Sequence, residues 1–347
     1  MAASAERTLT PRELNRALLA RQLLLERART TLPAALESMG GLQAQYAPSM
    51  YIGLWSRVEG FERDHLTRAL ERRTVVQGTL LRATIHLVSV RDYWPLSAAV
   101  GEARRDWWMR VARSGLTPEE VAAAAAWLRE RLADGPLRRR EIEDLLGKPL
   151  ASAVGLWLDL VRVPPSGTWE HRRADLYAAA ADWLEPADVT REEGLELLVR
   201  RYLGGFGPAR AGDIANWAGL SVASLAPALA RLSLRRFRNE QGRELLDVPT
   251  AALPDPDTPA PVRFLPTWDA ALLVHARRTG ILPEEHRPKV FSMKTPHSVG
   301  TFLVDGAVAG TWWYEGGTVR TEPFERLDAA TRRELAEEAE RLAAFHA

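Results

Sequence analysis

Near the start of the chain, apolar residues recur every three or four positions, which is the spacing of one face of a helix. Leucine and alanine form such a stripe over 11–28, with Pro11 in the first turn and Thr10 before it as a plausible N-cap. The pattern therefore predicts a helix over 11–28. The same signals predict two further helices, one over 33–39 that ends at Gly40-Gly41 and one over about 62–73.

The pattern changes at residue 74, where β-branched residues become frequent. Residues 74–90 predict a pair of strands that turns near Gln77-Gly78. Helices followed by a β-hairpin are typical of a winged helix, so we assign a first winged-helix unit to 10–113, which includes the segment Gln43-Ala44-Gln45.

The order of helices followed by a β-hairpin occurs twice more in the chain. In a second unit, 114–189, the predicted helices are followed by a hairpin over 161–172 that turns at Pro165-Ser166-Gly167; the helices span 118–133, 137–147 and 151–161. In a third unit, 190–250, helices over 191–203, 209–220 and 222–232 precede a hairpin over 234–248. Here Gly219 closes one short helix and Ser221 caps the next, which is the signature of a helix-turn-helix.

After a linker rich in Pro and Asp at 251–261, short strand-like runs alternate with glycine turns up to residue 320. One such run is Lys289–Met293, and Asp305-Gly306 is a hairpin turn. We expect a small β-barrel with a closing helix over 325–345, together spanning 262–347. The predicted fold is α+β and mainly helical, with three tandem winged-helix units followed by a small C-terminal β-barrel.

The amino-acid composition excludes several kinds of site and of protein. The 347 residues include no cysteine, which excludes disulfides, iron–sulfur clusters, thiolate zinc sites and a cysteine nucleophile. No apolar run approaches the ~20 residues that span a membrane, and the N-terminus lacks a signal core, so we expect a cytoplasmic protein with no membrane partner. The net charge of +1 does not by itself indicate a nucleic-acid partner.

Dinucleotide-binding, Walker A and nucleophile-elbow motifs are missing from the sequence, and we expect no cofactor. A group made of His275, His286 and Glu284-Glu285 fits no zinc motif, so we also expect no metal.

Five segments, taken together and in order, resemble the AlkZ/YcaQ superfamily of winged-helix bacterial DNA glycosylases. They are GLQAQYAPSMYIGLWSR, GTLLRATIHLVSVRDYW, YLGGFGPARAGDIANWAGLS, FLPTWDAALLVHARR and TFLVDGAVAGTWW, and the resemblance spans residues 10–345. The resemblance implies a C-shaped channel of three winged helices and a barrel that holds double-stranded DNA and excises alkylated bases. Gln43-Ala44-Gln45 resembles the Gln-aliphatic-Gln motif of the AlkZ-like branch, which is associated with self-resistance in producers of DNA-alkylating natural products.

Gln43 and Gln45 are the candidate catalytic residues. If their segment is extended, both side chains project from one face, and Gly40-Gly41 and Pro48 favour extension over a helix. Two amide oxygens can hold a water molecule between them, but glutamine cannot take a proton at neutral pH. Such a site suits a glycosidic bond that is already weak, as in an N7-alkylguanine, whose cationic base leaves readily. The alternative is two amides that are solvated or cap the backbone.

Several residues are candidate DNA contacts. Arg82 and Thr84 alternate with His86 along one predicted strand face and could meet phosphates, as could Arg57. For His86 the alternative is a hydrogen-bonded core histidine. For Asp269 we weigh two roles, as the partner of an arginine and, preferred, as the cap of the helix that follows it.

Lys294 and His297 lie in the loop 291–301 of the predicted barrel. By position, the resemblance implies a hairpin there that probes the minor groove.

The sequence therefore predicts a monofunctional DNA glycosylase for N7-alkylated purines, with bulky natural-product adducts and interstrand crosslinks as candidate substrates. A lyase activity is not expected, because no lysine lies near the Gln pair in the sequence. We expect a monomer whose partner is double-stranded DNA carrying alkylated bases. The alternative is a winged-helix protein that binds DNA without catalysis, as a regulator or a damage binder.

Overall fold

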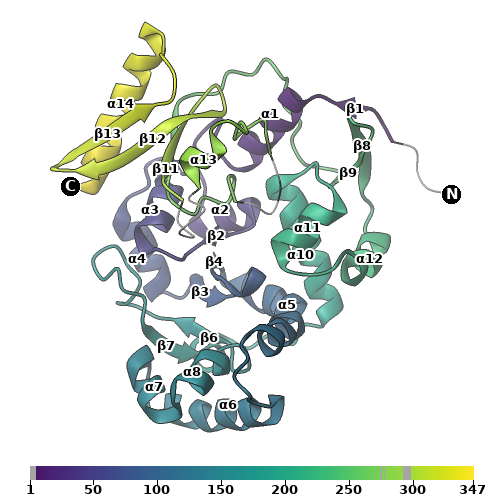
Figure 1. The fold of residues 1–347 in the computed structure, drawn as a ribbon, viewed down its shortest axis with the longest axis vertical. Coiled ribbons are helices and arrows are strands. Elements are labelled where there is room, and N and C mark those ends of the chain that lie inside the picture. Colours follow the sequence, from purple (N-terminus) through teal and green to yellow (C-terminus); the bar gives the residue numbers. More distant parts are fainter. Residues whose placement is uncertain (1–4, 274–275, 277, 292–297) are drawn as a thin grey trace.

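The computed structural model describes residues 5–273, 276, 278–291 and 298–347. Within these residues the chain forms fourteen α-helices and thirteen strands, and the strands belong to three sheets. Figure 1 shows the residues around 150 at the lower end of the molecule and the C-terminal strands and helix at the upper left. The predicted α+β class is confirmed.

The N-terminal segment contains five helices and the strands between them. The elements are β1 (Thr8–Leu9), α1 (Pro11–Arg21), α2 (Leu32–Met39), β2 (Leu42–Gln43), α3 (Ala47–Trp55), α4 (Arg63–Glu71), β3 (Val75–Thr79), the 3-10 turn η1 (Leu81–Ala83), β4 (Ile85–Ser89) and α5 (Val90–Val111). A capping box starts α1: the Thr10 hydroxyl accepts from the Glu13 amide and the Glu13 carboxylate accepts from the Thr10 amide. The helix ends at Arg21, earlier than predicted.

The first hairpin turns later than predicted. In the β3–β4 ladder Gly78 lies opposite His86, so the turn is at residues 80–84 and not at Gln77-Gly78. Gly78 is a residue of the central strand β3, where it also pairs with Val161, and it serves close packing and not a turn, because a Cβ there would lie 2.6 Å from the Tyr93 ring. The structure also adds α3, which the sequence analysis does not predict and which begins at Ala47, with Pro48 in its first turn.

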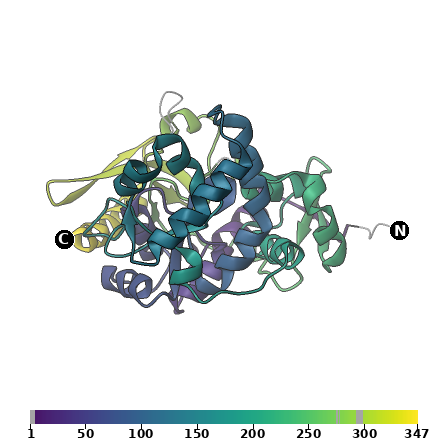
Figure 2. The same ribbon diagram turned by 90° about the horizontal axis from the view of Figure 1, so that it is seen from below.

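The second segment joins the first through a shared sheet. Its elements are α6 (Pro118–Leu132), β5 (Leu137–Arg138), α7 (Arg139–Leu146), α8 (Lys148–Val154), β6 (Leu160–Arg162), β7 (Leu176–Ala179) and α9 (Ala180–Trp183). The strand order β2-β4-β3-β6-β7-β5 places the first two hairpins in one six-stranded sheet, and Figure 2 shows the helices of this segment from below. The second hairpin is longer than the predicted 161–172, because its second strand, β7, begins only at Leu176. The predicted helix over 151–161 is wrong at its C-terminal end, because α8 stops at Val154 and β6 begins at Leu160.

The third segment matches its predicted elements most closely. It contains α10 (Arg191–Phe206), α11 (Ala211–Ala218), α12 (Val222–Arg231), β8 (Arg235–Asn239) and β9 (Glu244–Asp247). As expected, Gly219 ends α11 in the left-handed conformation, and the Ser221 hydroxyl caps α12 by accepting from the Ser224 amide. Strand β1 extends the β8–β9 hairpin as a parallel neighbour of β8.

The C-terminal strands form an open sheet. They are β10 (Arg263–Leu265), β11 (Gly300–Val304), β12 (Ala307–Glu315) and β13 (Thr318–Pro323), accompanied by α13 (Arg287–Val290) and α14 (Ala329–His346). The order β10-β11-β12-β13 is antiparallel, and within the described residues no pairing closes it into the expected barrel. The expected strand run at Lys289–Met293 is described only as far as Phe291, and its first two residues lie in α13, where Pro288 occupies the first turn.

Two large apolar clusters tie these segments together. The first draws buried side chains from α1, α5, α10, α11 and β11, including Leu18, Leu96, Leu198, Ile214 and Leu303. The second joins α2–α4 to β10–β12 and α14. The N- and C-terminal parts of the chain therefore share cores. None of the described helices combines the length and the hydropathy that crossing a membrane requires.

Candidate functional site

The Gln43–Gln45 segment runs along the edge of the six-stranded sheet. Gly40 ends α2, and β2 then pairs antiparallel with β4, so that Gln43 lies opposite His86. The ladder continues for one more residue, because the Ala44 amide donates to the Ile85 carbonyl at 2.7 Å. The backbone is thus extended through Ala44, as the sequence predicts, before α3 begins.

Both glutamine amides are anchored on the β3–β4 hairpin. The Gln43 Oε1 accepts a hydrogen bond from Arg82 Nη2 at 3.2 Å, and the Gln45 Oε1 accepts from the Ile85 amide at 3.2 Å. Gln43 is buried and Gln45 is exposed. A carbonyl oxygen has two lone pairs, so each amide oxygen can still accept from a water molecule.

Arg82 connects Gln43 to the third segment. Its backbone is left-handed, with φ of 52°, and its guanidinium also donates to the Trp217 carbonyl at the end of α11. Gly219 allows this approach, because a Cβ there would lie only 3.1 Å from the Arg82 Cα. Burial lowers the pKa of Arg82 to about 10, so the side chain remains charged at neutral pH. The sequence predicts Arg82 as a phosphate contact, and the structure places it on a candidate catalytic amide.

Thr84 and His86 follow Arg82 but do not share a solvent-facing strand face with it, because Arg82 lies in the turn. The Thr84 hydroxyl donates to the Leu81 carbonyl at 3.0 Å. His86 is only 3% exposed, with Nδ1 3.0 Å from the Thr84 carbonyl. The expected DNA contact by His86 is therefore not available in this structure, and its position fits the alternative of a hydrogen-bonded core histidine.

Arg57 is also an interior residue. Its Nη2 lies 2.9 Å from the Asp269 Oδ1, its Nη1 donates to the Gly53 carbonyl at 3.0 Å, and both ion-pair side chains are 0% exposed. A buried guanidinium offers no surface to a phosphate, so the expected DNA contact by Arg57 is corrected. Asp269 serves the arginine, the first of the two roles weighed for it. It also accepts from the Ala271 amide at 3.0 Å, but the described residues that follow form turns, so the preferred role as a helix cap is not confirmed.

Lys294 and His297, the candidate minor-groove contacts, lie outside the described residues. His275 does as well, so the group considered for a metal cannot be described in full. Among the described residues, Glu285, His286 and Glu325 bring one ligand atom each within 4.8 Å of one another. This spacing occurs often in exposed acidic groups, and the expectation of no metal remains a prediction.

The buried state of His86 makes the free energy of unfolding depend on pH. Burial, and next to it the charge of Arg82, lower the pKa of His86 from 6.5 to about 3. The unfolded chain therefore binds a proton that the folded chain does not, so this contribution is present above about pH 6.5 and lost as the pH falls toward 3. We expect it to lower the free energy of unfolding by about 1.4 kcal/mol per pH unit in that window.

Urea unfolding of the parent chain and of His86→Gln at pH 7 and pH 5 measures this effect. Between pH 7 and pH 5 the free energy of unfolding should fall more for the parent than for the variant. The difference should correspond to the uptake of about one extra proton on unfolding. His171→Gln is the control, because His171 is exposed. Equal pH slopes for the parent and His86→Gln would contradict the assignment.

The sequence reading missed two features of this site: the contact of Arg82 with Gln43 and the Trp217 carbonyl that holds the same guanidinium. The nearest signal in the sequence for these contacts is Gly219, which by itself predicts only the end of a helix. The contact it permits joins residues that lie far apart in the chain.

Known proteins are similar to this chain in sequence and in fold. A family model described as DNA glycosylase AlkZ-like matches residues 36–345. The fold is similar to the solved structure of the Streptomyces sahachiroi DNA glycosylase AlkZ, with a TM-score of 0.82, 19% sequence identity and 97% of each chain covered. No curated protein sequence matches. Because the family model covers most of the chain, this protein belongs to the AlkZ-like DNA glycosylase family.

Proposed function

We propose that this chain hydrolyses the N-glycosidic bond of N7-alkylated purines in double-stranded DNA, and that it has no lyase activity. Family membership supports a DNA glycosylase for alkylated bases. The observation that carries the finer proposal is the pair of amides at Gln43 and Gln45, which are tied to Arg82 in the turn and to Ile85 at the start of β4. Their hydrogen-bond partners in the described structure are a guanidinium and a backbone amide, and neither is a base that could deprotonate water.

In the proposed reaction the bond between N9 and C1′ breaks, and its electron pair neutralises the cationic base. Water held by the Gln43 and Gln45 oxygens forms the new bond to C1′, and its proton passes to solvent. Carbonyl oxygens also stabilise positive charge that develops on the sugar. Because no strong base assists, a leaving group that is already cationic is required. Neutral bases such as uracil and 8-oxoguanine should remain in place.

The proposal for DNA binding rests on the arrangement of the segments. We interpret the three helix-and-hairpin segments as winged helices that hold the duplex, with the C-terminal sheet beside them. The protein would act as a monomer, in the cytoplasm and associated with the nucleoid. Bulky natural-product adducts and interstrand crosslinks are candidate substrates, which would make the enzyme one of repair or self-resistance.

An excision assay tests the proposal. Duplexes carrying N7-methylguanine, N3-methyladenine, a bulky N7-guanine adduct, uracil or 8-oxoguanine are incubated with the protein, and released bases are identified by mass spectrometry. We expect free base from the alkylated substrates alone, and no protein–DNA adduct after borohydride treatment. Tight binding without base release would favour the alternative of a damage binder. Efficient uracil release would contradict the mechanism.

A further inference from the structure

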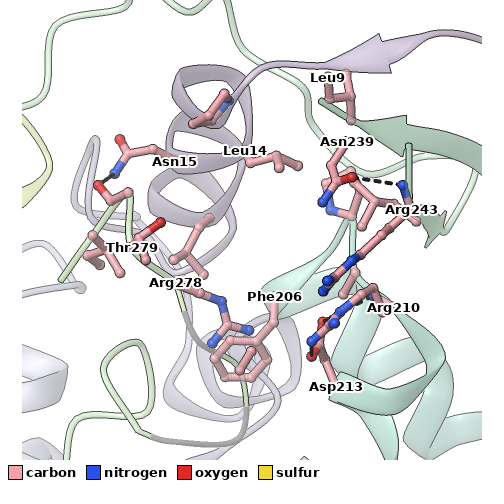
Figure 3. A pocket seen from close by; sticks show the side chains of 18 of the residues that line it. Leu9, Leu14, Asn15, Phe206, Arg210, Asp213, Asn239, Arg243, Arg278 and Thr279 are labelled. Atoms are coloured by element: carbon pink, nitrogen blue, oxygen red, sulfur yellow. Dashed lines mark hydrogen bonds and ion pairs between the residues drawn. The ribbon is translucent and has the colours of Figure 1, made fainter. Parts of the chain in front are cut away.

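A cavity of about 310 Å³ lies between α1, the start of α11, the β8–β9 turn and the segment 278–281. Three arginines line it, as Figure 3 shows: Arg278 lies on the side of Phe206, and Arg210 and Arg243 come from the opposite wall. The acidic residues of the lining are Asp213 and Glu240, so one positive charge is in excess.

Arg278 is a half-buried cation without an anionic partner among the described residues. Its Nη2 lies 3.0 Å from the Tyr202 hydroxyl, and its guanidinium carbon is 5.2 Å from the Phe206 ring centroid. Its Nη1 is buried and makes no hydrogen bond in the described structure. Burial raises the pKa of Tyr202 to about 12, so the phenol is neutral and does not balance the charge.

Other arginines of the fold do have such partners. Arg21 pairs with Asp247 at 2.7 Å, and within the cavity Arg210 is held by Asp213 through contacts of 2.7 and 3.1 Å. A partly desolvated charge is unfavourable unless it is paired. Arg278 lines a cavity with excess positive charge and has no carboxylate partner among the described residues, which indicates an anionic ligand at its accessible side.

A chain of side-chain contacts links the cavity to the candidate active site. The Tyr202 ring packs on Trp217 with centroids 5.2 Å apart, and the Trp217 carbonyl accepts from Arg82, which contacts Gln43. Two aromatic residues and one arginine thus separate Arg278 from the Gln pair.

We propose that this cavity binds a phosphate group of the DNA backbone near the damaged nucleotide, with Arg278 as the principal contact. The proposal rests on the proposed function for the identity of the DNA. A guanidinium donates two parallel hydrogen bonds to phosphate oxygens, and Arg243 is exposed at the same cavity and can add charge. Phosphate could also come from a free mononucleotide, and the experiment distinguishes the two sources.

The test compares Arg278→Gln with Arg333→Gln, which removes the same charge from an exposed position on α14. Affinity for an undamaged duplex is measured by fluorescence anisotropy over a range of salt. We expect Arg278→Gln to weaken binding by about tenfold and to reduce the magnitude of the salt slope by about 0.9.

Neutral methylphosphonates placed one at a time along the duplex locate the contact. At one position the substitution should weaken binding of the parent but not weaken Arg278→Gln further. Arg278→Lys keeps the charge and should retain the parent salt slope, and melting temperatures check that each variant is folded. Equal losses in Arg278→Gln and Arg333→Gln would overturn the proposal.

Thermal shifts with deoxyguanosine monophosphate form the second arm. A saturable shift that Arg278→Gln abolishes, with DNA affinity unchanged, would overturn the DNA backbone as the source of the phosphate. The proposed function is judged separately, by base release from alkylated DNA. A parent chain that releases no alkylated base would refute the proposed function, whereas the binding comparison would still decide the phosphate site.

Discussion

Replacing Gln43 by alanine is expected to slow base release by roughly tenfold to a thousandfold, with little change in DNA affinity. The loss should be at the low end for N7-methylguanine, which leaves readily, and larger for adducts that leave more slowly. Gln43 is the better oriented of the two amides, because Arg82 holds its oxygen and is itself held by the Trp217 carbonyl. Removing this oxygen removes one of the two positions that would hold the water.

The effect of replacing Gln45 should depend on the side chain that replaces it. Gln45→Ala should also lose activity, whereas Gln45→Asp should keep it, because a carboxylate binds water and stabilises an oxocarbenium-like sugar at least as well. Gln45 also accepts from the Ile85 amide, so the alanine variant could change the turn itself. Melting temperatures separate the two effects, since a purely structural pair would alter stability without a selective loss of rate.

Single-turnover rates on one defined adduct are the measurement. If Gln43→Ala and Gln45→Ala both release base at the parent rate, these residues are not catalytic, and a protein that binds DNA without catalysis describes the chain better.

Replacing Asp269 by alanine is expected to lower the free energy of unfolding by about 3–5 kcal/mol. Asp269 and Arg57 form a fully buried pair 2.9 Å apart. The substitution would leave the guanidinium buried without its carboxylate. A matched exposed pair is the control: Arg236–Glu244 has similar geometry at 2.7 Å but is open to solvent, so Glu244→Ala should cost at most about 1 kcal/mol.

Thermal and urea unfolding measure both variants. The double variant Arg57→Met with Asp269→Ala should recover part of the loss, because an apolar side chain of similar length needs no counter-charge. If Asp269→Ala and Glu244→Ala unfold at the same temperature, the buried pair does not stabilise the fold.

The sequence alone determined those parts of the fold that depend on neighbours in the chain. Thr10 with Pro11 marked the start of α1, and Gly219 with Ser221 marked the boundary between α11 and α12. Each of these signals is a hydrogen bond or a backbone conformation within a few residues. The same local reasoning, from Gly40-Gly41 and Pro48, correctly predicted an extended backbone at Gln43 and Ala44. The candidate role of the Gln pair came from the family resemblance.

Only the tertiary structure decided what depends on distant residues. The turn of the first hairpin lies at 80–84 and not at Gly78, because Gly78 is a strand residue that makes room for the Tyr93 ring, and no local pattern reports that contact. Arg57 and Arg82 have the charge and length of DNA contacts. In the fold they meet Asp269, 212 positions along the chain, and the Trp217 carbonyl, 135 positions along it. Periodicity and capping are short-range properties, whereas the burial of a charge is set by the long-range packing that brings its partner to it.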